Sequence, residues 1–517
     1  MNHFRFILSF LFASVFVIHS QAQQYTRQEA NVVMGGPLHD IIPCPGGDHL
    51  VITFPLVEDN DGNIAITRFG PQLSMQYNNS LKELPHPHYR GALYSDNRLF
   101  LFVNDKQGAV SRYEVDDKTG QITGRPLALY SLVGKEEEAS FYTGSSHDRN
   151  FHYCLVKNIG RKESGVTIQG VVLDKKMDVT AHFSFTTPEE KENYKDLEVI
   201  LSDKGVLSIV YGMSAKTKRN EYIPNKYTIV QVDEKGKTSA TPLSGLPVGD
   251  ISDLSWSMQG DQILFTGLFS PNGKGFTAIV GWYFDPVSKK ITDVRQTEVN
   301  ALTSNSPGFN KVTNGHGIDP LAKINQSLSL PDGSRIIVFE ELRGGYYQEG
   351  YYGGIYTPGH IDAGGQFFRY NAYVLKLDHQ NTPLWLDVVS KSQLELDISL
   401  RVGIASIADG KGNLHIFFYD SRKDTEPDAE SVKEVLTTKG KYESNYMACV
   451  SFTPDGKMKK QFLGKCGDYE FQPQPENSLS GVGNELYFMA IKDARGFTGA
   501  HVLHHADFRF GTISIKD

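Results

Sequence analysis

A short strand that is apolar on both of its faces recurs eight times along the chain, between polar and glycine-containing segments. A strand with one face in water alternates apolar and polar residues, so a continuous apolar run requires cover on both sides of its sheet. Such a chain must stack many similar sheets against one another. The eight runs are His49–Phe54, Arg98–Val103, Phe151–Val156, Val206–Tyr211, Gln262–Gly267, Arg335–Phe339, Leu414–Tyr419 and Leu486–Ile491.

Each run begins a repeated unit in which a loop and then a second strand follow. The second strands include Val110–Val115, Tyr227–Val232, Tyr373–Leu377 and Tyr446–Phe452. Between strands lie Asp/Gly turns, which supply the positive φ that tight hairpins require. These turns include Asp203–Gly205, Asp233–Gly236, Asp332–Gly333, Asp409–Gly410 and Asp455–Gly456. Each unit has room for four strands, and a long period of this kind is typical of a β-propeller.

We therefore predict an all-β fold, a single β-propeller of eight four-stranded blades over residues 23–517 with very little helix. Seven blades are the alternative, because the units at the two ends are the least regular. A string of β-sandwiches is a weaker alternative, because no Pro/Ser-rich linker separates domains. Polar residues in Gln121–Tyr130 suit an outer blade edge, and we expect Tyr25–Val33 to pair with the last blade and close the ring.

The first 22 residues have the form of a secretory signal peptide. Arg5 precedes the apolar run Phe6–Ile18, and Ser20-Gln21-Ala22 places small residues where a signal peptidase reads. A membrane anchor is the alternative, but an apolar run of about 13 residues is shorter than the roughly 20 that a spanning helix needs. We expect cleavage after Ala22, no membrane span, and export to the periplasm or outside the cell.

The net charge bears on nucleic-acid binding, and the four cysteines bear on possible disulfide bonds. The formal net charge is −8, which excludes nucleic-acid binding through a general basic surface. Export permits disulfides, and Cys44, Cys154, Cys449 and Cys466 allow three pairings, of which Cys449–Cys466 is the first to test. The alternative is buried free thiols, because Cys154 and Cys449 lie inside apolar strands.

The long loops of the repeated unit all leave one face of the predicted ring. By the strand order of a propeller, short turns join strands on one face, and the loops that follow the apolar runs or connect blades lie on the other. Long loops in compact domains often carry function, so this face is the candidate binding surface. The six loops are Glu83–Arg90, Thr187–Lys195, Gly212–Asn225, Thr303–Pro320, Arg343–Tyr370 and Ser421–Tyr442.

The segment Arg343–Tyr370 contains eight Gly and six Tyr residues. Tyr offers a flat apolar face with a polar tip and Gly permits close backbone approach, which suits a sugar ring or an extended peptide; the alternative is that these Tyr residues pack back onto the rim. Charged and histidine residues on nearby loops complete the candidate binding set. Its members are His86, His88, Arg90, His316, Asp319, Arg343, Tyr346, Tyr347, Tyr351, Tyr352, His360 and Asp362.

Established catalytic and cofactor motifs are absent from the sequence. There is no Gly-x-Ser-x-Gly elbow, His-Glu-x-x-His motif or Walker A loop. His86 and His88 could supply two metal ligands, but a structural site needs four, so we expect no metal and no cofactor. Glu340 and Glu341 are adjacent in sequence, yet two catalytic carboxylates must converge in space, which sequence cannot show.

Two stretches resemble uncharacterised secreted β-propeller-like proteins of Bacteroidota. They are Tyr370–Asp378 with Pro383–Trp385 and Val389–Gln393, and then Gly412–Asp420. The resemblance covers about 60 residues, implies a propeller and export, and carries over no functional residue. In this chain His379-Gln380-Asn381 replaces the more usual Asp/Gly turn.

Two functional hypotheses follow. The first is a binding or scaffold protein whose long-loop face holds a glycan, a peptide or an envelope protein. The second is a secreted polysaccharide lyase or glycoside hydrolase acting at the same face, which is an analogy from fold alone. The oligomeric state is left open.

Overall fold

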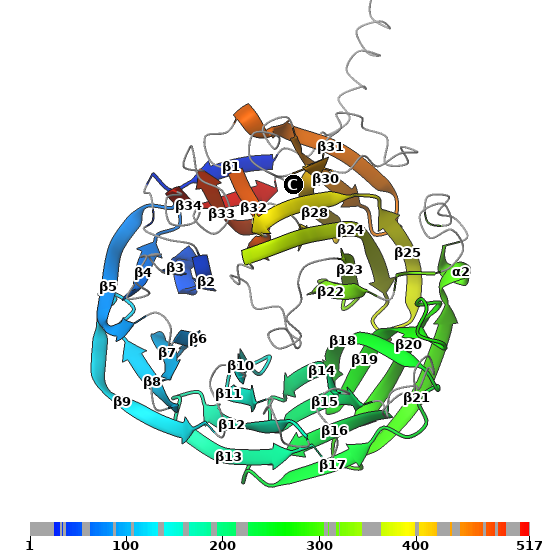
Figure 1. The fold of residues 1–517 in the computed structure, drawn as a ribbon, viewed down its shortest axis with the longest axis horizontal. Helices are drawn as coiled ribbons and strands as arrows, with labels where there is room; N and C mark the ends of the chain where they lie inside the picture. The colour runs from blue at the N-terminus through cyan, green and yellow to red at the C-terminus, as the bar shows by residue number, and fades with distance from the viewer. Residues whose placement is uncertain are drawn as a thin grey trace, which may run out of the picture.

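The computed structural model is a closed ring of eight antiparallel sheets arranged around a central axis (Figure 1). It describes residues 25–31, 34, 38–53, 63–85, 89–104, 108–132, 139–158, 165–187, 194–213, 226–303, 309, 317–319, 321–343, 363–398, 403–420, 435–436, 445–468, 472–480, 484–492 and 507–515. Each sheet is one blade, and in the first seven blades the four main strands run in chain order from the innermost to the outermost. The predicted eight-bladed propeller is therefore confirmed.

The first four blades follow the simple up-and-down order. Blade one contains β2 (Leu38–Pro43), β3 (His49–Thr53), β4 (Asn63–Phe69) and β5 (Met75–Pro85). Blade two contains β6 (Tyr89–Ser95), β7 (Arg98–Asn104), β8 (Ala109–Val115) and β9 (Ile122–Ser131). Blade three contains β10 (Ala139–Ser145), β11 (Phe151–Asn158), β12 (Thr167–Asp174) and β13 (Val179–Thr186). Blade four contains β14 (Tyr194–Leu201), β15 (Leu207–Met213), β16 (Lys226–Val232) and β17 (Thr238–Pro242).

The later blades keep the same order, with an elaboration in blade six. Blade five contains β18 (Asp250–Gln259), β19 (Gln262–Ser270), β20 (Ala278–Asp285) and β21 (Lys290–Glu298), followed by the short helix α2 (Val299–Leu302). Blade six contains β22 (Ala322–Ser329), β23 (Arg335–Arg343), β24 (Ala363–Leu377) and β25 (Pro383–Val389). The first part of β24 also pairs with β26 (Gln393–Ile398), which pairs in parallel with β29 (Val435–Leu436). Blade seven contains β27 (Ala405–Ala408), β28 (Leu414–Asp420), β30 (Tyr446–Phe452) and β31 (Met458–Lys465).

The two ends of the chain share the last blade. Blade eight contains β32 (Gln472–Ser480), β33 (Glu485–Lys492), β34 (Asp507–Ile515) and, as its outermost strand, β1 (Tyr25–Glu29). The register pairs Tyr25 with Ile515 and Glu29 with Gly511, and blue β1 lies beside red β34 in Figure 1. The predicted closure by the N-terminal segment is confirmed.

The eight apolar runs do not begin their blades as predicted: they are the second strands, and the strands predicted to be second, such as Val110–Val115, are the third. The side chains of the apolar runs are almost all buried, as in β15 and β28, because the neighbouring blades cover both faces. The hydrophobic core is accordingly a series of clusters between successive blades. The predicted outer edge is also confirmed, because β9 is largely exposed.

Connection lengths divide the ring into two ends. The first-to-second and third-to-fourth turns, such as residues 96–97 and 286–289, define the short-turn end. The second-to-third connections and those between blades leave the opposite, long-connection end, where all six predicted loops lie. Some predicted loop bounds were wrong. Arg343–Tyr370 is not loop throughout, because β24 begins at Ala363. Glu83–Arg90 is also shorter, because β5 extends to Pro85 and β6 begins at Tyr89.

Turn residues adopt the predicted left-handed backbone at Gly205, Gly236, Gly333 and Gly456. The turn after β27 uses Gly412, not Gly410. The turn between β24 and β25, His379-Gln380-Asn381, lacks glycine, and Asn381 has a φ of +64° there. Asn tolerates this left-handed backbone better than most other side chains. The backbone amides of Gln380 and Thr382 donate to Asp378 Oδ1 and complete that turn.

All four cysteines are free and buried. The structure therefore has the alternative of buried thiols and not the Cys449–Cys466 disulfide. Burial raises the pKa of Cys154 and of Cys449 to about 12, which leaves both thiols protonated and unreactive near neutral pH.

Candidate functional site

Six of the eight innermost strands carry a β-bulge close to their first residue, at the long-connection end. A bulge inserts an extra residue into one strand and redirects the neighbouring side chains, and bulges are frequent at barrel rims and beside active sites. We call these six positions the bulged rim. The register shifts fall between Leu38 and Asp40, Tyr89 and Gly91, Asp196 and Glu198, Ile251 and Leu254, Ile324 and Gln326, and Pro473 and Ser478.

Arg90 is the extra residue in the bulge of β6 and is the sequence-predicted candidate that the structure places on the rim. Its guanidinium lies 4.7 Å from the ring centroid of Phe141 in the next blade, and Nη1 donates to the carbonyl of Tyr89 at 3.0 Å. Gly91 has φ +146°, and a Cβ there would meet Thr143 Oγ1 at 2.9 Å. The bulge therefore brings β6 and β10 close together and holds Arg90 over an aromatic face.

An aromatic sector continues from Arg90 into blades three and four. Phe141, Tyr142 and Tyr194 are half-buried near the first residues of β10 and β14. Buried Lys157 places Nζ 5.8 Å from the ring centroid of Tyr142 and 5.5 Å from that of Tyr194. Cations held against aromatic faces are favourable when desolvated, and the three rings are only half-buried at this end of the ring.

An acidic sector occupies the rim of blades four to six. Glu198 follows the bulge in β14, and Asp253 is an extra residue in the bulge of β18. Lys323 Nζ donates to Asp253 Oδ1 at 3.0 Å, and the amide of Ile324 lies 3.4 Å from Oδ2. Burial, with a smaller contribution from the charge of Asp253, raises the pKa of Glu198 to about 8, although the Val199 amide opposes the rise.

Glu340 and Glu341 do not form a catalytic pair, because adjacent residues of a strand face opposite sides of the sheet. Glu340 forms a buried ion pair with Lys391 at 2.5 Å. Glu341 accepts hydrogen bonds from the hydroxyl of Tyr373 and from Asn371 Nδ2. Both carboxylates are thus committed to internal partners.

Asp319 lies just before β22 and shapes the entry into blade six. Its Oδ1 accepts from the amide of Leu321 at 2.9 Å, and its carbonyl accepts from the amide of Ala322 at 3.0 Å. Burial raises the pKa of Tyr373, and the charges of Glu341 and Asp319 raise it further. Asp319 therefore lies near the Glu341–Tyr373 pair and has a structural turn role there.

The structure does not describe the side chains of the remaining predicted candidates. Arg343 is the last residue of β23, but its side chain is not described. The others lie outside the described residues: His86, His88, His316, Tyr346, Tyr347, Tyr351, Tyr352, His360 and Asp362.

Buried histidines recur near the start of the second strand and are structural. His415 Nε2 lies 3.2 Å from Asp409 Oδ2, while its Nδ1 lies 2.9 Å from Ser451 Oγ. This resembles a Ser–His–Asp arrangement, but the Tyr25 hydroxyl covers it at 3.0 Å from Nδ1. His152 bonds Ser hydroxyls on both ring nitrogens in the equivalent strand of blade three, so the arrangement is a core feature shared between blades.

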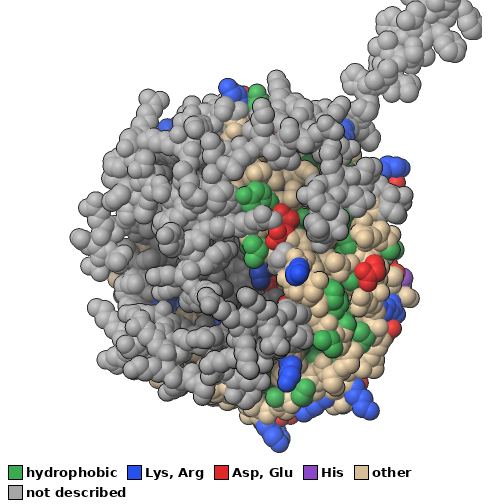
Figure 2. Space-filling view, turned by 45° about the vertical axis from the view of Figure 1, so that its right-hand side comes forward, with side chains coloured by type: hydrophobic (Ala, Val, Ile, Leu, Met, Phe, Trp, Pro, Cys, Tyr) green, Lys and Arg blue, Asp and Glu red, His purple; other side chains and the backbone are tan. Residues whose placement is uncertain are grey.

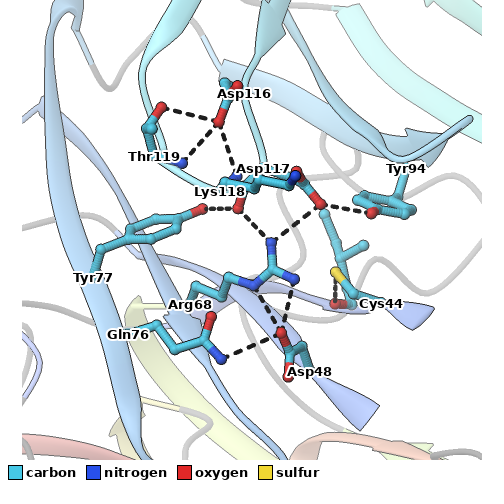
Figure 3. A network of polar contacts seen from close by, with 11 residues as sticks. Cys44, Asp48, Arg68, Gln76, Tyr77, Tyr94, Asp116, Asp117, Lys118 and Thr119 are labelled. Atoms are coloured by element: carbon cyan, nitrogen blue, oxygen red, sulfur yellow. Dashed lines mark hydrogen bonds and ion pairs between the residues drawn. The ribbon is translucent and has the colours of Figure 1, made fainter. Parts of the chain in front are cut away.

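A separate polar network joins blades one and two at the short-turn end (Figure 3). Arg68 donates to Asp48 Oδ2 through Nε at 3.0 Å and Nη2 at 2.7 Å, and to the carbonyl of Asp117 through Nη1 at 2.6 Å. The hydroxyls of Tyr77 and Tyr94 donate to Asp117 at 2.8 Å each. Burial alone would lower the pKa of Arg68, but its bonds to Asp48 and Asp117 raise it. The network is fully satisfied internally and fastens two blades.

The described surface offers no further concentrated site. No group of three or more His, Cys, Asp or Glu side chains among the described residues is placed to hold a metal. Exposed hydrophobic side chains occur at Val287, Val294 and Leu384 in blades five and six, and Figure 2 shows hydrophobic side chains scattered among charged ones on the described surface of that view. In the part of the chain that the structure describes, no helix has the length and apolar character to span a membrane.

No protein-family model matches the chain, and no curated protein matches it by sequence. Among solved structures, it is similar to an acylaminoacyl peptidase of Pyrococcus horikoshii at 9% identity and TM-score 0.36, over 89% of this chain and 58% of that one. It is similar to the β-propeller domain of the Trilobed protease of Pyrococcus furiosus at 9% identity and TM-score 0.32, over 68% and 93%. It is also similar to a PL25 ulvan lyase at 9% identity and TM-score 0.34, over 59% and 76%. The chain thus spans less than two thirds of the first peptidase, and none of these similarities assigns a site residue.

Proposed function

We propose that this is an exported glycan-binding protein whose ligand lies along the bulged rim. The observation that carries the proposal is the aromatic sector, where Phe141, Tyr142 and Tyr194 are half-buried beside Arg90 and Lys157. Sugar rings present apolar C–H faces and a belt of hydroxyls, so flat aromatic edges beside hydrogen-bond donors complement both. Export rests on the signal peptide expected in residues 1–22.

The position of the sector supports binding at this end of the ring. The loops expected to hold a ligand leave the same end as the bulges, and the Tyr/Gly-rich residues 344–362 connect β23 to β24 there. The buried ion pair between Glu340 and Lys391 stabilises blade six at this end of the ring. Loops positioned on a rigid scaffold are a common construction for a binding surface. A peptide or envelope protein remains the other candidate ligand for the same face.

A panel of soluble polysaccharides, tested by isothermal titration calorimetry against residues 23–517, examines the proposal. We expect micromolar binding to at least one glycan. The double variant Arg90→Ala/Tyr142→Ala should raise the Kd for that glycan at least tenfold. The matched control is Arg295→Ala/Tyr283→Ala in blade five, where Arg295 pairs with Asp293 and Tyr283 bonds Gln380 away from the bulged rim. Equal losses in both double variants, or binding of peptides alone, would contradict a glycan site on the rim.

Replacing residues 344–362 by a short Gly/Ser linker tests the contribution of the insert. The change retains β24, which begins at Ala363. We expect weaker glycan binding with an unchanged melting temperature.

A further inference from the structure

We propose that the seam between blades five and six holds a small monovalent anion of the size of chloride, beside Arg335 and Thr266. Arg335 is the first residue of β23, directly after the turn from β22, so the site lies at the short-turn end of the ring. The glycan surface proposed above is at the opposite end. The anion site is therefore a second site, and it does not depend on the proposed function.

The Arg335 guanidinium is buried and crosses the seam. The residue is 4% exposed. Its Nη1 donates to Ser255 Oγ at 3.2 Å, and its Nη2 donates to Thr266 Oγ1 at 3.4 Å and to Asn381 Oδ1. Ser255 and Thr266 belong to blade five, while Asn381 is in the turn between β24 and β25 of blade six. All three acceptors are electrically neutral, so none of them balances the charge of the guanidinium.

Two other buried cations of this protein have a carboxylate partner. Lys391 Nζ lies 2.5 Å from Glu340 Oε1, and Lys460 Nζ lies 2.5 Å from Asp420 Oδ2. Among the residues that the structure describes, no carboxylate forms an ion pair with Arg335. Burial lowers the pKa of Arg335 to about 10, so the guanidinium stays protonated at neutral pH. Because a buried charge without a counter-charge is strongly unfavourable, an anion would stabilise this seam.

A hydroxyl hydrogen at the same place also lacks an acceptor. Thr266 is fully buried, and its Oγ1 accepts from Arg335 Nη2 and from Asn381 Nδ2. A hydroxyl has two acceptor lone pairs and one donor hydrogen, so these two bonds use both lone pairs. The remaining hydrogen has no acceptor in the described part of the chain. An anion accepts from hydroxyl and guanidinium hydrogens alike, and it would satisfy both groups at once.

Space beside Thr266 comes from Gly281 on the neighbouring strand β20. The register places Gly281 directly opposite Thr266, so a side chain there would lie on the same face of the sheet. Apart from adjacent residues, a Cβ at Gly281 would have two described atoms within 4 Å, Phe265 O at 3.4 Å and Thr266 Oγ1 at 3.9 Å. A chloride ion is similar in radius to a methyl group, so the volume that an alanine side chain would take can hold the ion. Gly281 is half-buried, which gives the ion a path from solvent.

The charge of the site favours a monovalent ion. One guanidinium supplies one positive charge, so a monovalent anion makes the seam neutral. A divalent phosphate or sulfate would leave a net negative charge in a poorly solvated position, which is unfavourable. A water molecule would accept from Thr266 but would leave the charge of Arg335 unbalanced. Water is therefore the competing occupant.

Chloride binding is measured from the broadening of the chloride NMR line by residues 23–517, and its effect on stability from the melting temperature. Sodium isethionate, whose anion is monovalent but too large for the space, replaces sodium chloride at constant ionic strength. Arg335→Met removes the cation with a side chain of similar length. Gly281→Ala fills the space and removes no hydrogen bond, so it decides the question if Arg335→Met does not fold. Arg295→Met is the matched control, because Arg295 is exposed and bonds Thr382 across the same seam.

We expect the wild type and Arg295→Met to broaden the chloride line and to melt at a higher temperature in chloride than in isethionate, because a ligand that binds only the folded state stabilises it. Arg335→Met and Gly281→Ala should each raise the Kd for chloride at least tenfold and abolish the difference in melting temperature. A wild type that leaves the chloride line unchanged and melts at the same temperature in both salts would overturn the inference in favour of water. Chloride binding retained in Gly281→Ala, or in a folded Arg335→Met, would overturn it as well.

Discussion

At the short-turn end, Arg68 joins two carboxylates and fastens blade one to blade two. At the long-connection end, six of the innermost strands bulge, and the charged residues Arg90, Asp253 and Lys323 are partly open to solvent. Short turns permit little variation, because a tight hairpin must keep the strands in register. Long connections release that constraint, so the open end can acquire a ligand site while the other end maintains the ring.

This comparison predicts that substitutions at the short-turn end change stability and those on the rim change binding. Four substitutions test it, from the largest expected effect on the free energy of unfolding to the smallest. The first, Glu340→Gln, tests the comparison most severely, because it changes a buried ion pair at the long-connection end.

Glu340→Gln should destabilise the protein by about 4 kcal/mol although Glu340 lies at the long-connection end. The change leaves the buried ammonium of Lys391 without its carboxylate, and breaking a buried pair typically costs about 3–5 kcal/mol. Urea denaturation measures the loss. A loss below about 1 kcal/mol would show that this pair is not part of the scaffold, and exposed Glu298→Gln should leave stability unchanged.

Arg68→Leu should lower stability by about 3 kcal/mol and leave glycan affinity unchanged. Asp48 and Asp117 would keep their partly buried charges but lose their common donor, and hydrogen bonds to charged groups contribute about 1.5–3 kcal/mol each. The melting temperature and the calorimetric Kd measure the two effects, with exposed Arg295→Leu as the control. A change in Kd would show that the two ends are coupled.

Asp409→Asn should cost about 2 kcal/mol at neutral pH, and the cost should shrink in acid. Burial would raise the pKa of Asp409, but hydrogen bonds from His415 and Asn413 hold it at about 2. A pKa depressed by folding gives stability that is complete above about pH 4 and is lost as the pH falls toward 2. Denaturation of both proteins at pH 7, 4 and 3 measures the difference, and a gap independent of pH would contradict this account.

Arg90→Ala should change stability by less than about 1 kcal/mol, the size of a partly exposed cation–π contact, while it weakens glycan binding at least tenfold. Arg90 packs on Phe141 and donates to the carbonyl of Tyr89 in its own strand. A large loss of stability with unchanged affinity would place Arg90 in the scaffold and reverse the comparison for this residue.

The fold could be predicted because its strongest signal is burial of the second strands on both faces. Runs such as Leu414–Tyr419 are apolar throughout, and the turns beside them carry Asp and Gly residues that the structure uses. Closure by Tyr25 could be anticipated because a ring needs a strand to complete its last blade.

The rim could not be predicted, because the innermost strands give no clear pattern. In β10 every residue is half-buried, and in β14 and β18 the bulges interrupt the alternation that marks a strand. Glu198 and Asp253 therefore have no sequence signal of their own. Arg90 was predicted as a binding residue from its position at the end of a long loop. Glu340 and Glu341 are adjacent in sequence, but the pleat of β23 places their side chains on opposite faces of the sheet.

The pairing of Tyr25 with Ile515 bears on how the chain folds. Contacts between residues so distant in sequence form late, because loop closure must precede them. Until the C-terminal strand has been synthesised, the N-terminal strand has no partner, and blade eight cannot be completed. During that interval the unpaired edge of β1 would be open to strands of other copies. The time between synthesis of the two ends is thus the period in which a chaperone would most improve the yield of closed rings.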